Sequence, residues 1–207
     1  MATKRFYPIL LIFLSFSSSM ILIFRPSMVI SRSVAKLDNV RMALEVVIFD
    51  RLAKSSRERY VSTAYARKLA PYVGKFHTVK PNRMELEILA GQEIKDELSL
   101  YNACETVLNK GLHRIFVSLG TEGCLYMDQE GRMLRRKLKP CEHMVNATGA
   151  GDAFTAAMIY ATLEQLPIES VMDYAMAAGI AAIGHERTIN PQMSISLLES
   201  ILKEYKQ

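Results

Sequence analysis

The chain has 207 residues, half of them hydrophobic, and a formal net charge of +5, which agrees with a globular protein. Its basic residues are scattered, so the charge gives no reason to expect a nucleic-acid partner. Three cysteines without C-x-x-C spacing and four histidines that form no ligand pair predict neither a disulfide framework nor a structural metal site.

The first sixty residues differ in character from the rest. Apolar residues 9–14 and 20–24 flank a run of serines, and Lys4 and Arg5 precede them. This pattern is typical of a signal peptide or a short membrane anchor. We therefore expect residues 1–30 to be an apolar leader or a membrane anchor carried by residues 6–24. Within the ambiguous helical or linker segment 31–60, apolar positions from Val34 to Ile48 suit a helical face, whereas residues 46–49 could be a short buried strand. Both alternatives stay open, and residues 51–59 are a charged linker in either case.

From residue 61 onward, helix and strand patterns alternate. The expected strands are 76–80, 114–118, 124–128 and 132–138, and the expected helices are 63–70, 82–90, 96–110, 153–166, 168–183 and 194–205. This alternation predicts an α/β fold with a partly parallel sheet and helices on its faces. Ligands of such sheets bind at the carboxyl ends of the strands, where Asn82, Gly120 and Gly149 are expected.

Residues 146–154, with the sequence Asn-Ala-Thr-Gly-Ala-Gly-Asp-Ala-Phe, place small residues and a carboxylate at the start of an apolar helix. The backbone at Gly149, Ala150 and Gly151 is open to a ligand, and the free N–H groups of a helix start can hold an anion. Asp152 could then accept a proton from an attacking hydroxyl. Alternatively, Asp152 only caps the helix and the glycines only form the turn. Taken alone, this segment favours capping.

Two segments upstream also have a structural and a functional interpretation. Lys-Pro-Asn-Arg-Met-Glu at 80–85 gives Asn82 and Glu85 the spacing of a capping box. Ser-Leu-Gly-Thr-Glu-Gly at 118–123 could form a plain hairpin turn, because glycine tolerates positive φ angles. The sequence lacks the G-x-x-x-x-G-K-[ST] phosphate loop and the protein-kinase motifs.

In this order, the three segments resemble the ribokinase-like (PfkB) carbohydrate and nucleoside kinases, from about residue 61 to the C-terminus. The resemblance implies a three-layer α/β/α fold, ATP as phosphoryl donor, and Asp152 as the catalytic base. Gly149, Ala150 and Gly151 would form an anion hole, and Glu85 would hold Mg²⁺ through water. The implied nucleotide-binding residues are Asn82, Ser118, Gly120, Thr121, Glu122 and Gly123.

Within this family, residues 79–85, 145–153 and 188–194 are similar to pseudouridine kinases, and Asn146 in place of the usual Asp fits that branch. The resemblance therefore implies phosphorylation of a sugar or nucleoside, with pseudouridine as the favoured substrate. It also implies an intracellular protein, cytoplasmic or organellar, and a possible homo-oligomer. A K⁺ site is implied weakly near Asn146, Thr148 and Ala182.

The family's N-terminal half, which carries most sugar contacts, has no recognisable counterpart in residues 1–60. We therefore expect an N-terminally truncated kinase fold in which residues 61–207 form the kinase C-terminal region. We expect these 207 residues to bind magnesium-nucleotide weakly and to phosphorylate pseudouridine little or not at all. The alternatives are a catalytically incomplete nucleotide-binding fragment or partner subunit, and a membrane-anchored interaction protein.

Overall fold

The computed structural model describes residues 10–16, 19–25 and 66–205, apart from residues 140, 142, 143, 147 and 188. Its main sheet has the strand order β3-β4-β5-β6. The strands are β3 (Thr78–Val79), β4 (Arg114–Ser118), β5 (Cys124–Asp128) and β6 (Met133–Arg136). β3 is parallel to β4, whereas β5 is antiparallel to both of its neighbours. The predicted partly parallel sheet is therefore confirmed.

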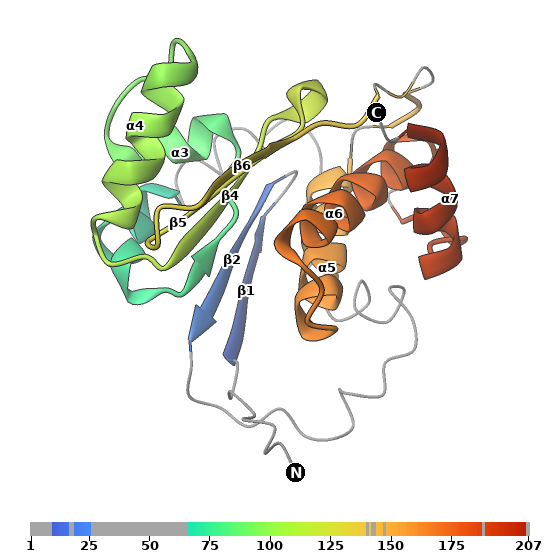
Figure 1. Cartoon of the computed structure of the whole chain (residues 1–207), viewed down its shortest axis with the longest axis horizontal. Coiled ribbons are helices and arrows are strands. Elements are labelled where there is room, and N and C mark those ends of the chain that lie inside the picture. Colours follow the sequence, from blue (N-terminus) through green and yellow to red (C-terminus); the bar gives the residue numbers. More distant parts are fainter. Residues whose placement is uncertain are drawn as a thin grey trace.

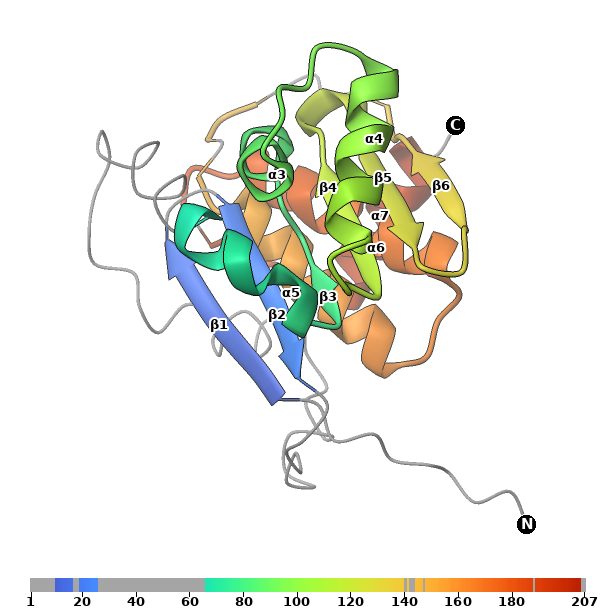
Figure 2. The ribbon, with the colours of Figure 1, turned by 90° about the vertical axis from the view of Figure 1, so that its left-hand side faces the viewer.

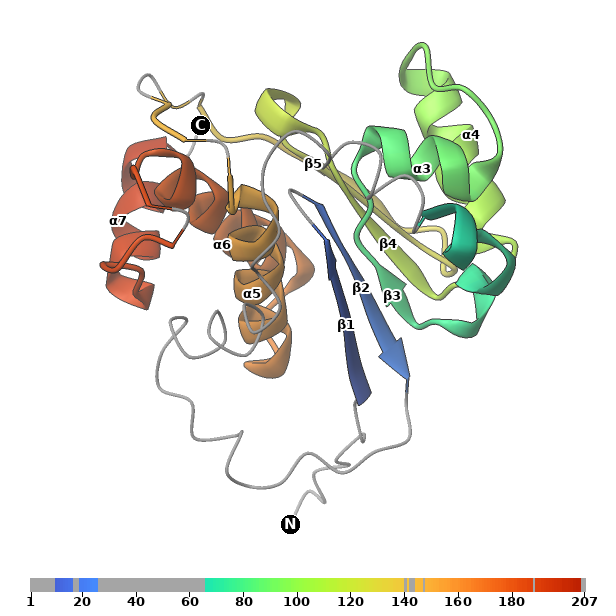
Figure 3. The same ribbon diagram turned by 180° about the vertical axis from the view of Figure 1, so that it is seen from behind.

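Helices cover both faces of this sheet (Figure 1). One face carries α3 (Arg83–Ala90), α4 (Glu97–Leu108) and the 3₁₀ helix η3 (Ala70–Lys75). The other carries α5 (Ala150–Leu163), α6 (Ile168–Ile183) and α7 (Ile195–Tyr205). The reverse view in Figure 3 shows the same separation. The expected three-layer α/β/α arrangement is confirmed.

The alternation of side chains along the strands explains the three layers. Ile115 and Val117 pack into the core beneath α3 and α4, whereas Phe116 between them packs into the core formed with α5, α6 and α7. Leu125 and Tyr126 on the next strand divide between the same two cores. Because successive side chains of a strand point to opposite faces, a strand apolar at every position needs a helical layer on each side.

Two predicted strands are shorter than expected. The segment 76–80 pairs as a strand only at Thr78–Val79, and the segment 132–138 only at Met133–Arg136. The chain nevertheless continues beside β4, because Ser118 donates its N–H to the Pro81 carbonyl at 3.0 Å. An isolated parallel bridge also joins Asn82 to Ser118. Proline has no N–H to donate, which interrupts the ladder at residue 81.

The helix boundaries also differ from those expected in some places. The helix expected at 96–110 is α4, for which Asp96 is the N-cap and Asn109 the C-cap. The helix expected at 153–166 begins three residues earlier and ends at Leu163. The described part of the helix expected at 63–70 passes into η3 at Ala70. Propensity alone does not fix such ends, because capping contacts and tertiary packing decide them.

Strands β1 (Leu10–Phe16) and β2 (Ser19–Arg25) pair in antiparallel orientation and are called the hairpin below. The hairpin is a separate two-stranded sheet, and β2 lies beside β3 and α5 (Figures 2 and 3). Among the described residues, no helix is long and apolar enough to cross a membrane. The segment 31–60, for which the helical and linker alternatives were left open, lies outside the described residues.

An ion pair fastens the last strand of the sheet to the helical layer. The Arg136 guanidinium on β6 donates Nε and Nη2 to Asp173 Oδ1 at 2.9 and 2.8 Å, and Nη2 also reaches Oδ2 at 2.8 Å. Asp173 on α6 is buried. Such a two-pronged pair fixes both distance and orientation. It therefore sets the position of β6 against α6.

Candidate active site

The first turn of α5 lies in the middle of the predicted signature and follows a glycine N-cap. Its N-cap residue is Gly149, whose φ of 95° lies in the left-handed region and which has no side chain to cap the helix. Ala150 and Gly151 are the first two helical residues. Gly149 is buried, and Ala150 and Gly151 are partly exposed. The first N–H groups of a helix have no intrahelical partner, which is the property that lets helix starts bind anions.

Asp152 lies inside this turn and not before it, because the helix begins at Ala150. It is therefore not the N-cap residue. Its side chain is buried, with 5% of the residue exposed, and Phe154 two residues later packs into the core. A carboxylate in this position is favoured by the positive end of the helix dipole. The role of catalytic base stays a prediction.

The start of α3 is capped by the side chains of Asn82 and Glu85. The Asn82 amide oxygen accepts from Glu85 N at 2.9 Å, and Glu85 Oε2 accepts from Asn82 N at 2.9 Å. This confirms the predicted capping box. Only 1% of Glu85 is exposed, so the box holds a carboxylate in the interior. Structural and ligand-binding roles for these two residues are compatible.

Lys80 is a candidate site residue that the sequence motifs did not indicate. It follows β3 directly and is fully buried. Its Nζ donates to Ser118 Oγ at 3.5 Å and lies 5.6 Å from the centroid of the Phe154 ring. Burial lowers the pKa of Lys80, while the charges of Glu85 and Asp152 raise it. The available signal was a lysine at the end of the segment predicted as a strand, directly before Pro81. Charged residues are rarely buried without partners.

Lys80 and its neighbours bring three predicted site residues together. Ser118 contacts the Lys80 ammonium directly, and Glu85 and Asp152 both act on its charge. The carboxyl ends of β3 and β4 thus meet the first turns of α3 and α5. This is the edge of an α/β sheet at which ligands bind.

Two glycines in the predicted nucleotide turn have different surroundings. The turn contains the 3₁₀ helix η4 (Gly120–Glu122) and joins the antiparallel strands β4 and β5. A Cβ on Gly120 would meet no atom within 4 Å, whereas a Cβ on Gly123 would lie 2.1 Å from the Arg136 carbonyl oxygen. Both glycines have positive φ angles. Gly120 therefore leaves the outer side of the turn open, while Gly123 allows the turn to pack against β6.

The remaining predicted nucleotide residues are exposed. Thr121 and Glu122 both lie on the surface, but the Glu122 carboxylate is engaged by arginines. The turn does connect two neighbouring antiparallel strands, as the hairpin interpretation expected. Its geometry is also compatible with a nucleotide loop, which stays a prediction.

The predicted monovalent-cation residues lie near the end of α6. Asn146 donates its backbone N–H to the Ile183 carbonyl at 3.1 Å and its amide group to the Glu186 carbonyl at 3.0 Å. Its amide oxygen accepts from Thr148 N at 2.9 Å. Ala182 is buried in the last turn of α6. The structure thus ties the beginning of the signature to the α6 C-terminus, where backbone carbonyls gather.

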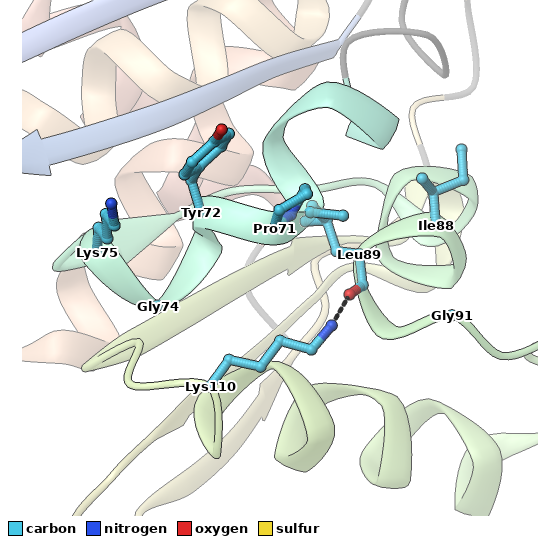
Figure 4. A pocket seen from close by; sticks show the side chains of 9 residues that line it. Pro71, Tyr72, Gly74, Lys75, Ile88, Leu89, Gly91 and Lys110 are labelled. Atoms are coloured by element: carbon cyan, nitrogen blue, oxygen red, sulfur yellow. Dashed lines mark hydrogen bonds between the residues drawn. The ribbon is translucent and has the colours of Figure 1, made fainter.

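A separate pocket of about 680 Å³ lies away from this site and contains none of the predicted site residues. It is bordered by η3, the end of α3 and Lys110 (Figure 4). The Lys110 ammonium donates to the Leu89 carbonyl at 2.5 Å, and Lys75 Nζ lies 5.2 Å from the Tyr72 ring centroid. The pocket is therefore independent of the signature and its neighbours.

Two curated relatives cover much of the chain. 1-Phosphofructokinase of Escherichia coli K12 is 28% identical over 172 residues, which are 82% of this chain and 51% of that protein. Pseudouridine kinase of the same strain is 28% identical over 137 residues, or 66% of this chain and 43% of that protein. The chain thus spans about half the length of these relatives.

Solved structures share the fold. A putative sugar kinase from Clostridium perfringens matches with a TM-score of 0.67 and 35% identity, over 70% of this chain and 46% of that one. Ribokinase of Arabidopsis thaliana, complexed with ribose and ATP, matches with a TM-score of 0.61 and 25% identity, over 65% and 43%. Phosphofructokinase-2 of Escherichia coli in complex with potassium matches with a TM-score of 0.58 and 27% identity, over 66% of this chain and 44% of that one. These matches confirm the ribokinase-like fold.

The family model described as pfkB family carbohydrate kinase matches residues 28–195. The match begins upstream of residue 61, where the resemblance in sequence was expected to start, and it includes all three motif segments. The division of the chain into three segments stays a prediction. The chain belongs to the pfkB family of carbohydrate kinases.

Proposed function

We propose that this chain carries the nucleotide side and the catalytic base of a kinase that transfers the γ-phosphoryl group of ATP to a sugar or nucleoside hydroxyl. The observation that carries the proposal is the first turn of α5, where buried Asp152 follows a glycine N-cap and two small residues. The family and its kinase relatives support the same reaction class.

In the proposed reaction, Asp152 accepts the proton of the acceptor hydroxyl as the hydroxyl oxygen attacks the γ-phosphorus. The bond between that phosphorus and the bridging oxygen then breaks, and ADP leaves. The N–H groups at Gly149, Ala150 and Gly151 stabilise the negative charge on the phosphoryl oxygens, because they point from a helix start. Lys80, whose charged form is favoured by Glu85 and Asp152 and opposed by burial, lies at the same edge of the sheet.

The donor set fits Mg²⁺ bound mainly through the nucleotide. Mg²⁺ keeps several waters and uses one or two carboxylates together with substrate phosphates. Glu85 and Asp152 supply buried carboxylates on the two helix starts that face this edge. We assign Glu85 to the metal's water shell, and Asn82, Ser118 and the open side of Gly120 to the nucleotide.

A monovalent cation is proposed near Asn146. One of the matched phosphofructokinase-2 structures is a complex with potassium. In this chain the carbonyl-rich end of α6 and the loop at Asn146 are held together by hydrogen bonds to backbone carbonyls. Backbone carbonyls are suitable ligands for such an ion, and K⁺ would support the fold of the anion-binding turn.

For the acceptor, we propose pseudouridine, with a fructose phosphate as the second candidate. Pseudouridine is supported by the signature with Asn146 and by one curated relative. Fructose phosphates are supported by 1-phosphofructokinase relatives and by phosphofructokinase-2 among the matched structures. We further propose an intracellular protein that forms a homo-oligomer, as a matched phosphofructokinase-2 is tetrameric.

The first experiment measures binding of magnesium-ATP to the 207-residue chain by calorimetry, with and without K⁺. We expect weak, magnesium-dependent binding. Phosphoryl transfer is then assayed with pseudouridine, uridine, ribose and fructose phosphates. The assay uses the chain itself and an extended protein in which a family N-terminal half precedes residue 61.

We expect little or no transfer from the 207-residue chain and pseudouridine phosphorylation by the extended protein. The reason is geometric, because a small misplacement of the reacting hydroxyl costs about 10²-fold in rate. Preferential transfer to a fructose phosphate would replace pseudouridine as the acceptor. Failure of the chain to bind magnesium-ATP would overturn the proposal.

A further inference from the structure

Glu122 occupies the predicted nucleotide turn, but its carboxylate is held by two arginines from other elements. Arg83 Nη2, at the first residue of α3, donates to Glu122 Oε2 at 3.1 Å. Arg135 Nη2 on β6 lies 3.5 Å from the same oxygen and donates to the Glu122 backbone carbonyl at 3.3 Å. Two cations from separate elements therefore meet on one side chain of the turn.

The contacts extend into a network. Arg135 Nη1 lies 3.6 Å from Glu97 Oε1 on α4, and Tyr101 donates its hydroxyl to the same Glu97 oxygen at 2.5 Å. Arg83, Glu122, Arg135 and Glu97 thus form a series of neighbouring ion pairs that joins α3, the turn, β6 and α4. Isolated exposed ion pairs contribute little, but linked pairs with a shared geometry can fix a loop.

Arg83 connects the turn to the start of α3. It follows Asn82 directly, and Asn82 forms both the capping box and the bridge to Ser118. The Arg83–Glu122 pair therefore joins the first turn of α3 to the nucleotide turn. The turn is also packed against β6, because Gly123 lies close to the Arg136 carbonyl.

We propose that Glu122 is a positioning residue and not a nucleotide ligand: with Arg83, it holds the nucleotide turn in register with Asn82 and Glu85. This inference rests on the proposed function. A bare carboxylate beside a triphosphate would repel it. Here the two arginines compensate the charge of Glu122, while Gly120 leaves the outer side of the turn open for the ligand.

The test compares Glu122→Gln, Arg83→Gln and the double variant in the full 207-residue chain. Magnesium-ATP dissociation constants are measured by calorimetry and thermal midpoints by circular dichroism. We expect each single variant to weaken binding by roughly three- to fivefold, the scale of an exposed charge pair. The double variant should bind no more weakly than either single variant, because both remove the same pair.

Glu93→Gln is the matched control. Glu93 forms an exposed pair with Lys95 at 3.1 Å, outside the network, and the variant removes the same charge. We expect it to leave the dissociation constant unchanged. In the extended protein, Glu122→Gln should raise KM for ATP and leave kcat unchanged, a split that a general loss of structure does not produce.

The possible outcomes separate the two proposals. If the wild-type chain binds magnesium-ATP and the Glu122 and Arg83 variants bind equally well, the positioning role is wrong and the proposed function stands. Additive effects in the double variant would show that the residues act separately, which also contradicts the coupling. Absence of binding by the wild-type chain would overturn both.

Discussion

The two ends of β3 carry two basic residues with contrasting surroundings. His77 precedes the strand and Lys80 follows it, so a buried two-residue segment separates them. Burial lowers the pKa of both side chains. At Lys80, Glu85 and Asp152 oppose this effect, whereas at His77 the charges of Arg114 and His113 reinforce it and bring the pKa from 6.5 to about 4.

The two ends of β3 differ in the charged groups that surround them. At the amino end of β3, His77 stacks on His113 with ring centroids 4.9 Å apart, and its Nδ1 lies 2.8 Å from Thr78 Oγ1. Because its pKa is lowered, the His77 imidazole is uncharged near neutral pH. At the carboxyl end, the carboxylates on α3 and α5 favour the charged form of Lys80. The ionisable groups that favour each other's charged forms therefore lie at the carboxyl end of β3, near the first turns of α3 and α5.

The largest effect is expected from Asp152→Asn, which removes the proposed base from the carboxyl end. General-base catalysis contributes about 10²- to 10⁴-fold, so phosphoryl transfer by the extended protein should fall by that factor. Magnesium-ATP binding to the 207-residue chain should be retained, because Asn has nearly the same shape. Phosphoryl transfer at an undiminished rate would exclude Asp152 as the base. It would also remove the proposed catalytic difference between the Lys80 end and the His77 end of β3.

Lys80→Met tests whether the two carboxylates depend on the buried cation. The variant leaves the buried carboxylates of Glu85 and Asp152 without the nearby ammonium group. Removing one member of a set of buried charges costs up to about 3–5 kcal/mol. We expect urea denaturation to show a loss of that size. The double variant Lys80→Met/Asp152→Asn should be more stable than the sum of the two single effects predicts. Strict additivity would mean that Lys80 and Asp152 are not coupled.

Asn82 separates the structural role of the α3 start from ligand binding. Asn82→Ala removes one half of the capping box and should lower the free energy of unfolding by about 1 kcal/mol. Asn82→Asp keeps a good N-cap but adds a negative charge beside the proposed phosphate site. We therefore expect near wild-type stability and weaker magnesium-ATP binding for Asn82→Asp. Equal binding by wild type and Asn82→Asp would leave Asn82 with a capping role alone.

The last prediction concerns His77 and the pH dependence of stability. Its pKa is lower in the folded protein than the ordinary histidine value of 6.5, so the unfolded state binds more protons between pH 6.5 and about 4. The contribution of His77 is fully present above pH 6.5 and is lost as the pH falls towards 4. In His77→Gln, unfolding midpoints measured across this window should decline less steeply than in wild type. Parallel profiles for the two proteins would contradict the shift.

Much of the fold was predictable because local patterns are strong in this chain. Strands Arg114–Ser118 and Cys124–Asp128 and the helix Ile168–Ile183 have the expected bounds. The Asn82 capping box was visible in the spacing of two residues. Apolar periodicity and cap residues act over a few positions, so the sequence alone determines these elements.

Only the tertiary structure decided the contacts between segments far apart in the chain. Folding buries Lys80 where the charges of Glu85 and Asp152 raise its pKa, and it pairs Glu122 with two arginines. It also started α5 at Ala150, which placed Asp152 inside the first helical turn. Burial, charge compensation and a helix's first residue depend on neighbours brought together by folding, whereas the motif order that indicated the family is a property of the sequence itself.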